Sequence, residues 1–303
     1  MPHRPTIRQL EYLVMLGETG HFGEAAKRCN VSQPTLSVQI ALLEKRLGCP
    51  LIDRTPGQIA PTPTGASIIA AARQVLNNLD DMVAMASASR GSLGGLIRLG
   101  AVPTFGPYFL PRLLPELHAS YPGLKLHIRE ERPLLLEEQV ADGSIDCGLG
   151  PMPADVEIFE FHAICDERIF LGVPIDHPLA ERETVTLASL AREDLLTLGK
   201  GHRLLQNVRD LARASGASLV EDYEGTSLDA IRQMVSISMG LSLFPELYVR
   251  SEFPGERNVK LLTIADWSGS RTIGFFWRRQ SVRAAHYRRL ASLGKTVAQD
   301  LLA

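Results

Sequence analysis

The segment Ser32–Leu47, SQPTLSVQIALLEKRL, carries side chains that suit the recognition of another molecule. Ser32 is a favourable helix N-cap, and a proline two residues later is tolerated in a first helical turn. A helical wheel gives one apolar stripe opposite a small, nearly uncharged face: the stripe is Leu36, Ile40, Leu43 and Leu47, and the other face and its tip carry Gln33, Pro34, Thr35, Ser37, Val38, Ala41 and Lys45. Amides can bond to base edges, hydroxyls to phosphates and a methyl to thymine, so this face fits a DNA major groove. A surface helix of a globular bundle is the alternative that this segment alone leaves open.

Two shorter helices are expected to position this segment. The first begins after Thr6 and ends near Gly17, and the second ends before a tight link at Asn30-Val31. Both have apolar residues at helical spacing: Ile7, Leu10 and Val14 in the first, and Phe22, Ala25, Ala26 and Cys29 in the second. Such an arrangement is a helix-turn-helix. Residues 51–62 then read as a short strand, a turn at Pro56-Gly57 and a returning strand, which form a wing.

The stretch HFGEAAKRCNVSQPTLSVQIALLEKRLGCPLIDRT closely resembles the N-terminal signature of the LysR-type transcriptional regulators. The resemblance implies a winged helix-turn-helix that binds double-stranded DNA. It places Ser32, Gln33, Pro34, Thr35, Ser37 and Val38 at the groove, and Arg54, in the wing, on a phosphate.

Composition limits the other classes of function. The chain has 303 residues, 45% apolar content and a net charge of −2, so two or three well-cored domains are expected. Residues 1–90 have nine Lys/Arg and seven Asp/Glu, a small positive excess. We expect no membrane span, no secretory signal, no cofactor and a cytoplasmic location, because there is no long apolar run and the four cysteines show no metal-binding spacing. Catalytic motifs such as a P-loop, a GxSxG elbow or a zinc cluster are absent from the sequence, so no enzyme is expected.

A long helix is expected from Thr64, after a DNA-binding domain at 1–62. Apolar residues recur along residues 63–90 at alternating spacings of four and three: Ile68, Ala72, Val75, Leu79, Met82 and Ala86. A buried helix within one monomer is one reading, and a dimerisation helix, as in the LysR family, is the other and favoured one. A homodimer would present two recognition helices to half-sites roughly 34 Å apart. Residues 91–95 are the predicted hinge.

Residues 96–303 alternate strands and helices, which indicates α/β lobes around mostly parallel sheets. We predict lobe I at about 96–165 and 270–303, and lobe II at about 166–269. Two lobes joined by crossing strands resemble periplasmic binding proteins and the LysR effector domain. Three segments are expected at the carboxyl ends of strands, beside helix N-termini: Pro103-Thr104-Phe105, Gly199–Leu204 and Thr226-Ser227. Their hydroxyls and backbone N–H groups favour an anionic or polar effector, although Thr104 and Ser227 can equally be plain helix caps.

A narrower resemblance, to the peroxide-sensing OxyR-like branch, covers most of the chain. It is carried by PTFGPYFLPRLLPELHASYPGLKLHI, DGSIDCGL, GHRLL and EGTSLDAIRQMVSISMGLSLFPEL. In that branch a reactive cysteine follows the GH of Gly201-His202, and a resolving cysteine lies nine residues further on. This chain has Arg203 and Ala212 at those positions, and Pro133 where the branch has a threonine. A thiol switch needs an accessible, low-pKa thiolate and a partner thiol, which an arginine cannot supply.

Arg203 therefore has two readings. An arginine offers a charged fork that suits a carboxylate or phosphate, so it could hold a small anionic effector together with Thr104, Ser227 and His202. It could instead form a salt bridge across the cleft to Glu130 or Glu131 that locks one state. A redox response through non-standard cysteines is a third reading: Cys29 and Cys147 are expected to be packed, while Cys49 and Cys165 could be exposed. In the LysR family an effector shifts the arrangement of lobes and dimers, usually in a homotetramer, and so changes contact with RNA polymerase.

Overall fold

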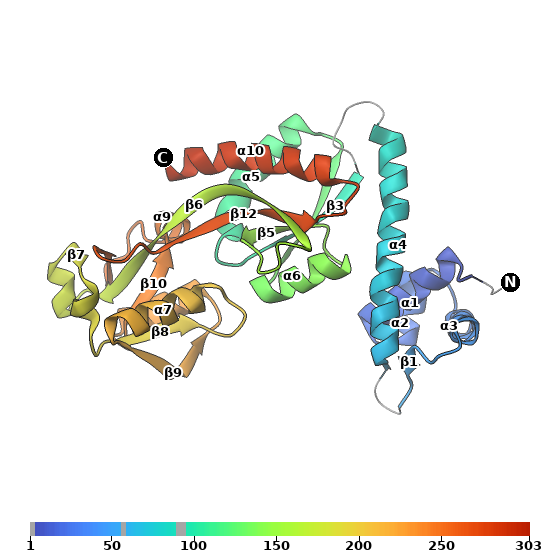
Figure 1. The fold of residues 1–303 in the computed structure, drawn as a ribbon, viewed down its shortest axis with the longest axis horizontal. Coiled ribbons are helices and arrows are strands. Elements are labelled where there is room, and N and C mark those ends of the chain that lie inside the picture. The colour runs from blue at the N-terminus through green and yellow to red at the C-terminus, as the bar shows by residue number, and fades with distance from the viewer. Residues whose placement is uncertain (1–3, 56–58, 89–94) are drawn as a thin grey trace. The chain divides into compact units, whose positions relative to one another are not determined.

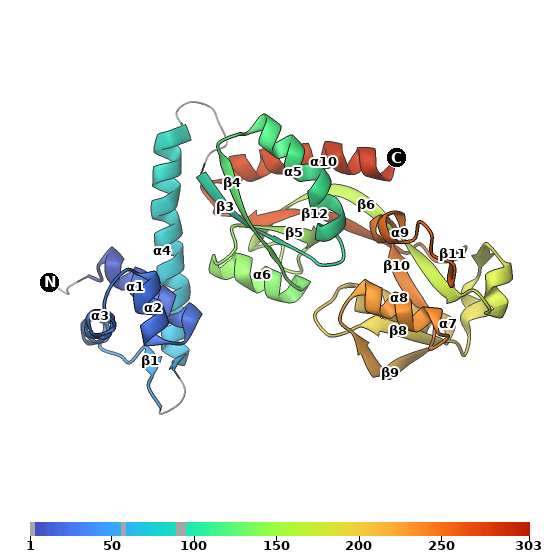
Figure 2. The same ribbon diagram turned by 180° about the vertical axis from the view of Figure 1, so that it is seen from behind.

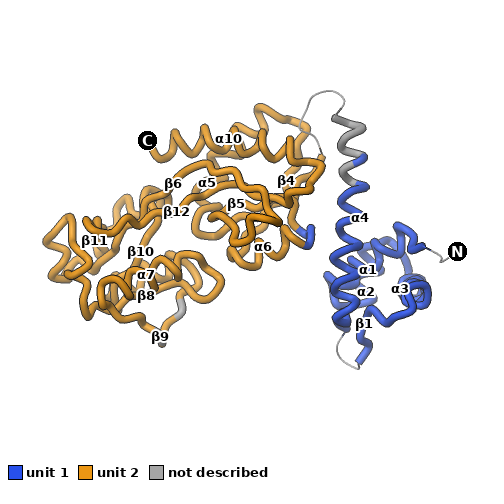
Figure 3. Tube along the Cα trace, viewed as in Figure 1, with its two compact units in different colours: residues 1–91, 142–144 blue, residues 92–141, 145–303 orange. Residues whose placement is uncertain are grey.

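The computed structural model describes residues 4–55, 59–88 and 95–303 (Figure 1). The chain divides into two compact units, residues 1–91 with 142–144 and residues 92–141 with 145–303 (Figure 3). Each unit is built on hydrophobic cores of its own.

The first unit contains the predicted helix-turn-helix. Its elements are α1 (Ile7–Thr19), α2 (Phe22–Arg28), α3 (Gln33–Leu47), β1 (Ile52–Asp53), β2 (Ala60–Pro61) and α4 (Pro63–Ala88). Thr6 caps α1 through a capping box with Gln9, and the left-handed Gly20 ends it, so α1 runs two residues past the predicted Gly17. Strands β1 and β2 pair antiparallel as the wing. The predicted turn at Pro56-Gly57 lies outside the described residues.

The apolar stripe of α3 fills the core of this unit. Leu36, Ile40 and Leu43 are fully buried, and Leu47 packs partly against them. The start of α4 closes the same core through Ile69 and Ala72. The predicted seam of α4 therefore divides into a packed part and an exposed part. Val75 is 45% exposed and Met82 is 65% exposed, while the side chain of Ala86 is not described.

The second unit has a mixed sheet whose strand order is β4-β3-β5-β12-β6-β11-β7, with β10 paired to β6, and a parallel pair β8–β9. The strands are β3 (Gly95–Ala101), β4 (Leu124–Glu130), β5 (Cys147–Pro151), β6 (Phe159–Pro174), β7 (Thr184–Val185), β8 (Asp194–Leu198), β9 (Ser218–Gly225), β10 (Ser242–Pro245), β11 (Val259–Ile264) and β12 (Ser270–Arg278). The helices are α5 (Gly106–Ser120), α6 (Pro133–Asp142), α7 (Leu204–Ser215), α8 (Leu228–Ser236), α9 (Glu246–Glu252) and α10 (Ala284–Leu302).

The expectation of mostly parallel sheets was wrong for the centre of this sheet. Strand β3 pairs parallel with β4 and β5, but β12 is antiparallel to both β5 and β6, and β10 and β11 are antiparallel to β6. The chain leaves one lobe along β6 and returns along β12, so these two neighbours must run in opposite directions. Residues Leu187–Leu190 form a short 3-10 turn.

Two hydrophobic cores give this unit two lobes joined by β6 and β12. One core lies under β3, β5, α5, α6 and α10, and the other lies among β8, β10, α7 and α8. In the first lobe, α5 and α10 cover one side of the sheet and α6 the other (Figures 1 and 2). Tyr108, at the start of α5, packs against both cores. Over the described ranges, none of the helices combines the length and apolar character that a bilayer crossing needs.

Candidate nucleic-acid and effector sites

The N-terminal half of α3 presents the side chains predicted to contact DNA. Ser32, Gln33, Pro34 and Thr35 are exposed, and Ser37 is half-buried. Val38 is 56% exposed, directly opposite the buried stripe. The Ser32 hydroxyl accepts from the Thr35 backbone N–H at 3.3 Å, so it caps the helix as well as standing at its tip.

Gln9 orients α3, a role that the sequence reading missed. Its side chain is almost fully buried and donates from Nε2 to Gln39 Oε1 at 3.1 Å. Its Oε1 accepts from Arg46 Nη1 at 2.8 Å. A buried glutamine with both ends bonded fixes the rotation of α3 relative to α1. The signal in the sequence was the capping box at Thr6, which accounts for only one of its bonds.

Arg54, the predicted phosphate contact, is held by Glu44. Arg54 Nη2 donates to Glu44 Oε2 at 2.7 Å, and the guanidinium lies 5.8 Å from the centroid of the Phe22 ring. Glu44 Oε1 accepts from the backbone N–H groups of Leu51 and Ile52. Almost half of the Arg54 side chain is exposed, so its remaining donors can reach an anion from a fixed position.

In the first effector segment, Thr104 is part of a buried network. Its Oγ1 accepts from Arg271 Nη1 at 2.7 Å and its carbonyl accepts from Arg271 Nη2 at 2.8 Å. Arg271 Nε donates to Glu167 Oε2 at 2.7 Å, and Glu167 Oε1 accepts from the Leu247 backbone N–H. These bonds of Thr104, Glu167 and Arg271, called the hinge network below, thus join the β3–α5 loop, β12, β6 and α9. A buried ion pair bonded on all sides in this way is costly to break on one side only.

The other two residues of that segment lie differently from the prediction. Pro103 is half-buried, whereas the Phe105 side chain is fully buried in the core, 5.0 Å from Phe109 between ring centroids. The Phe105 backbone N–H already donates to the Val102 carbonyl. The expectation of a free N–H was therefore wrong at Phe105, because the chain turns tightly between β3 and α5.

Arg203, in the second segment, forms a salt bridge between the lobes. Its Nη2 donates to Glu137 Oε1 at 2.6 Å, while Glu137 Oε2 accepts from the Ala154 backbone N–H at 3.1 Å. The predicted partners Glu130 and Glu131 were wrong, because α6 begins at Pro133 and brings its second turn toward the loop before α7. Buried Pro133 starts that helix. Among the described residues, Arg203 Nε is buried without a hydrogen-bond partner.

His202 lies beside this salt bridge and is 8% exposed. Burial, and secondarily the charge of Arg132, lower the pKa of His202 below its ordinary value. Arg132 Nη1 in turn donates to the Lys200 carbonyl at 3.4 Å. The loop before α7 therefore contacts the start of α6 through Arg203 and through Arg132.

Ser227, in the third segment, caps α8. Its Oγ accepts from the Ala230 backbone N–H at 3.1 Å, and neighbouring Thr226 is exposed. The structure thus brings His202 and Arg203 to the N-terminus of α6, where Pro133 stands. Within the described part of the chain, Thr104 and Ser227 make their hydrogen bonds elsewhere.

Three of the four cysteines lie in surroundings that disfavour thiolates. Cys147 is fully buried, and burial raises its pKa well above the ordinary value. Burial, with the charge of Glu167, raises the pKa of Cys165 to about 12. Burial also raises the pKa of Cys29, and Cys49 is half-buried. Since the thiolate is the species that attacks peroxide, these shifts slow such a reaction at Cys29, Cys147 and Cys165. The described ranges hold no group of three or more His, Cys, Asp or Glu side chains placed for a metal ion.

Known proteins resemble both units. The model of the bacterial regulatory helix-turn-helix protein, lysR family, matches residues 7–66, and the model of the LysR substrate binding domain matches residues 90–298. The DNA-binding transcriptional dual regulator OxyR of Escherichia coli (strain K12) is 38% identical over 285 residues, 94% of this chain and 93% of that protein. A hydrogen peroxide-inducible genes activator of Haemophilus influenzae is 36% identical over 286 residues, 94% of this chain and 95% of that protein.

Solved structures resemble the whole chain. A full-length OxyR variant from Pseudomonas aeruginosa has a TM-score of 0.80 at 31% identity, covering 97% of this chain and 95% of that one. A hydrogen peroxide-bound OxyR variant from Corynebacterium glutamicum has a TM-score of 0.66 at 30% identity, covering 100% and 95%. With a DNA-binding helix-turn-helix and an effector-binding domain both matched, the chain belongs to the LysR family of bacterial transcription regulators.

Proposed function

We propose that this regulator binds its operator as a cytoplasmic homodimer, through Gln33, Pro34, Thr35, Ser37 and Val38 of α3, with Ser32 at the tip and Arg54 on a phosphate. The observation that carries this proposal is the exposed, small and neutral face of α3 opposite a fully buried stripe. The proposal includes a DNA-binding domain at 1–62, a dimerisation helix at 63–90, a hinge at 91–95 and an effector domain at 96–303. We also propose that two dimers pair into a tetramer and that the regulator contacts RNA polymerase.

The effector in this proposal is a small anion that acts at Arg203 and His202. Support comes from the buried, unpartnered Nε of Arg203 and from the position of this arginine at the N-terminus of α7. The OxyR relatives are described as hydrogen peroxide-inducible activators. Arg203 stands where the resemblance puts the reactive cysteine of that branch, so we infer that this chain does not share their stimulus.

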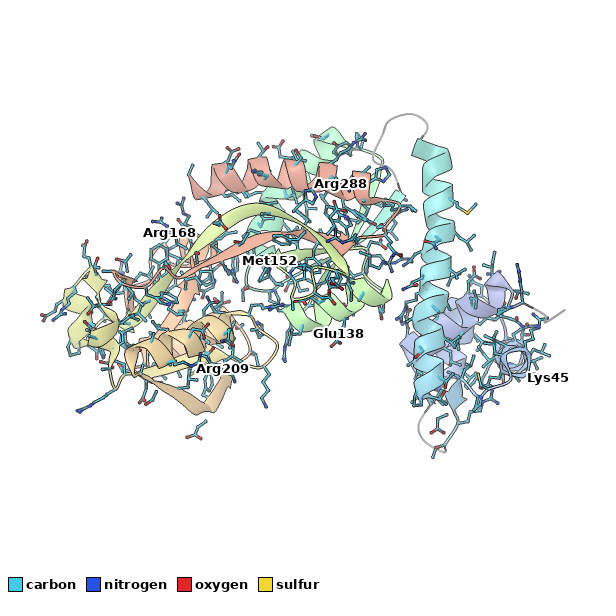
Figure 4. The ribbon with its side chains drawn as sticks, in the orientation of Figure 1. Lys45, Glu138, Met152, Arg168, Arg209 and Arg288 are labelled. Carbon is cyan, nitrogen blue, oxygen red and sulfur yellow. The ribbon has the colours of Figure 1, made fainter. Side chains whose placement is uncertain are left out.

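A thermal-shift series tests the anion. Inorganic phosphate, acetate and benzoate are added in turn to the full-length protein, to Arg203→Met and to the control Arg209→Met, an exposed arginine on α7 (Figure 4). An anion at 100 times its dissociation constant should stabilise the protein by about 2.7 kcal/mol. Stabilisation that is retained in Arg209→Met and lost in Arg203→Met is the expected result. Equal stabilisation of all three proteins would remove Arg203 from the effector site.

A further inference from the structure

The two lobes are connected along strands β6 and β12, through Tyr108, which packs against both cores, and at a salt bridge away from these strands. Strands β6 and β12 carry the chain between the lobes, and the hinge network of Arg271, Glu167 and Thr104 lies on them. Away from the strands, the loop before α7 contacts the start of α6 through the salt bridge of Arg203 with Glu137 and through Arg132 with the Lys200 carbonyl. Both of these contacts between α6 and the loop before α7 are made by side-chain donors, so they can open without unfolding either lobe.

The surroundings of the Arg203–Glu137 pair distinguish it from a fully exposed surface salt bridge. The Arg203 side chain is 33% exposed and that of Glu137 only 13%, so both are partly desolvated. The Ala154 N–H holds the second oxygen of Glu137, so less side-chain freedom is lost when the pair forms.

Arg203 and Glu137 are well placed to control the lobes because they belong to different lobes. Glu137 is fixed to lobe I by α6 and by the Ala154 N–H. Arg203 is the N-cap residue of α7 and moves with lobe II. If the pair breaks, the Glu137 carboxylate becomes fully hydrated only when the lobes separate there, because Glu137 is largely shielded in the present arrangement.

We propose that the Arg203–Glu137 pair is an ionic latch that holds lobe II against lobe I in the resting regulator. Opening the latch changes the arrangement of the lobes and, through the dimer, the spacing at which the recognition helices contact DNA. The proposal rests on the proposed function as a LysR-type regulator. The latch deepens the proposed function because it says what sets the resting state. That state is held by an ion pair, which an oxidant does not break, and not by thiol chemistry.

Hydrogen–deuterium exchange on the full-length protein tests the latch. Glu137→Gln, Arg203→Met and the double variant are compared with Glu138→Gln and Arg209→Met, exposed neighbours on α6 and α7 that are labelled in Figure 4. We expect exchange in residues 152–156 and 199–206 to accelerate at least about fivefold in each latch variant, with no further increase in the double variant. The two controls should exchange like the wild type.

A reversed pair guards against misfolding of the single variants. Glu137→Arg combined with Arg203→Glu keeps one charge of each sign at the contact, so it should return exchange in both segments toward the wild-type rate. Each protein is also footprinted with hydroxyl radicals on the DNA upstream of its own gene. The latch variants should shift the protected positions in the absence of any added anion, and the reversed pair should restore them.

Each outcome decides a different claim. Unchanged exchange in both segments, or faster exchange with an unaltered footprint, would overturn the latch. If the wild type protects no DNA at all, the proposed operator binding fails, while the exchange rates still decide whether the salt bridge holds the lobes together.

Discussion

At the residue scale, each of two candidate site arginines is held by a carboxylate that the sequence alone does not identify. Arg203 and Arg54 are recognisable from their positions in motifs, but their partners, Glu137 and Glu44, are not. The identity of a partner depends on how two elements are rotated against each other. Glu130 and Glu131 are as acidic as Glu137, and only the start of α6 at Pro133 selects among the three.

Removing the Arg54 guanidinium should weaken DNA binding without altering sequence preference. For Arg54→Ala we expect an affinity about threefold to tenfold lower and a salt-dependence slope reduced by about 1, as for loss of one phosphate contact. Fluorescence anisotropy on operator and scrambled DNA at several salt concentrations measures both. Arg209→Ala, which removes the same charge from α7, should leave the slope unchanged, and an equal loss there would point to bulk charge alone.

His202 should make the protein less stable in mild acid. Its folded-state pKa is lowered by burial, so the unfolded chain binds a proton more readily. The penalty is absent well above the unfolded value of about 6.5, and it grows as the pH falls through that value. The urea midpoint should therefore decline less between pH 7.5 and pH 5.5 in His202→Gln than in the wild type. His286, whose pKa burial also lowers, requires a parallel His286→Gln measurement, and identical pH profiles for wild type and His202→Gln would contradict the prediction.

At the element scale, amphipathic helices were predictable and several strands were not. The expected first helix, recognition helix and long helix all match observed elements to within a few residues. Strands β9 and β11 and helix α9 were missed. Strand β11 reads VKLLTI, whose burial alternates only weakly, and α9 has just seven residues, too few for a helical period to stand out.

Helix α4 provides a prediction at this scale. Val75 and Met82 lie seven residues apart and are exposed, as a helix seam awaiting a partner would be. Placing like charges there, Val75→Glu with Met82→Glu, should raise the dimer dissociation constant at least about tenfold. Sedimentation equilibrium measures it, with Gln74→Glu, one position off the seam, as the matched control. A dimer that is equally stable in both proteins would place the interface elsewhere.

At the scale of the whole molecule, the resemblance to OxyR proteins and the chemistry of this chain point to different stimuli. The fold matches over nearly the entire length. This chain, however, has Arg203 where the resemblance places the reactive cysteine, and three of its thiols have raised pKa values. A fold can host such a change because the lobes need only a contact that can open, whatever its chemistry. The sequence shows that the two cysteines of that branch are missing, but not that Arg203 contacts Glu137, because this contact depends on tertiary packing.

Peroxide should therefore leave the regulator unaffected. We expect the melting temperature and the DNA footprint to be the same after treatment with hydrogen peroxide at submillimolar concentration as after dithiothreitol. The physical reason is the scarcity of thiolate at Cys147 and Cys165. A peroxide effect that dithiothreitol reverses would restore the redox reading, and Cys49→Ser would then be the first variant to examine.

The place of β12 in the sheet also orders events during synthesis. Strand β12, Ser270–Arg278, lies between β5 and β6, although 95 residues separate it from the end of β6 and 118 from the end of β5 along the chain. Lobe II draws its core from a continuous stretch between Ile169 and Ile264, so a ribosome delivers that core in one piece. The sheet of lobe I stays incomplete until the ribosome has synthesised β12 and α10. Arg271 is part of β12, so Glu167 can form its buried ion pair with Arg271 only when translation is nearly complete.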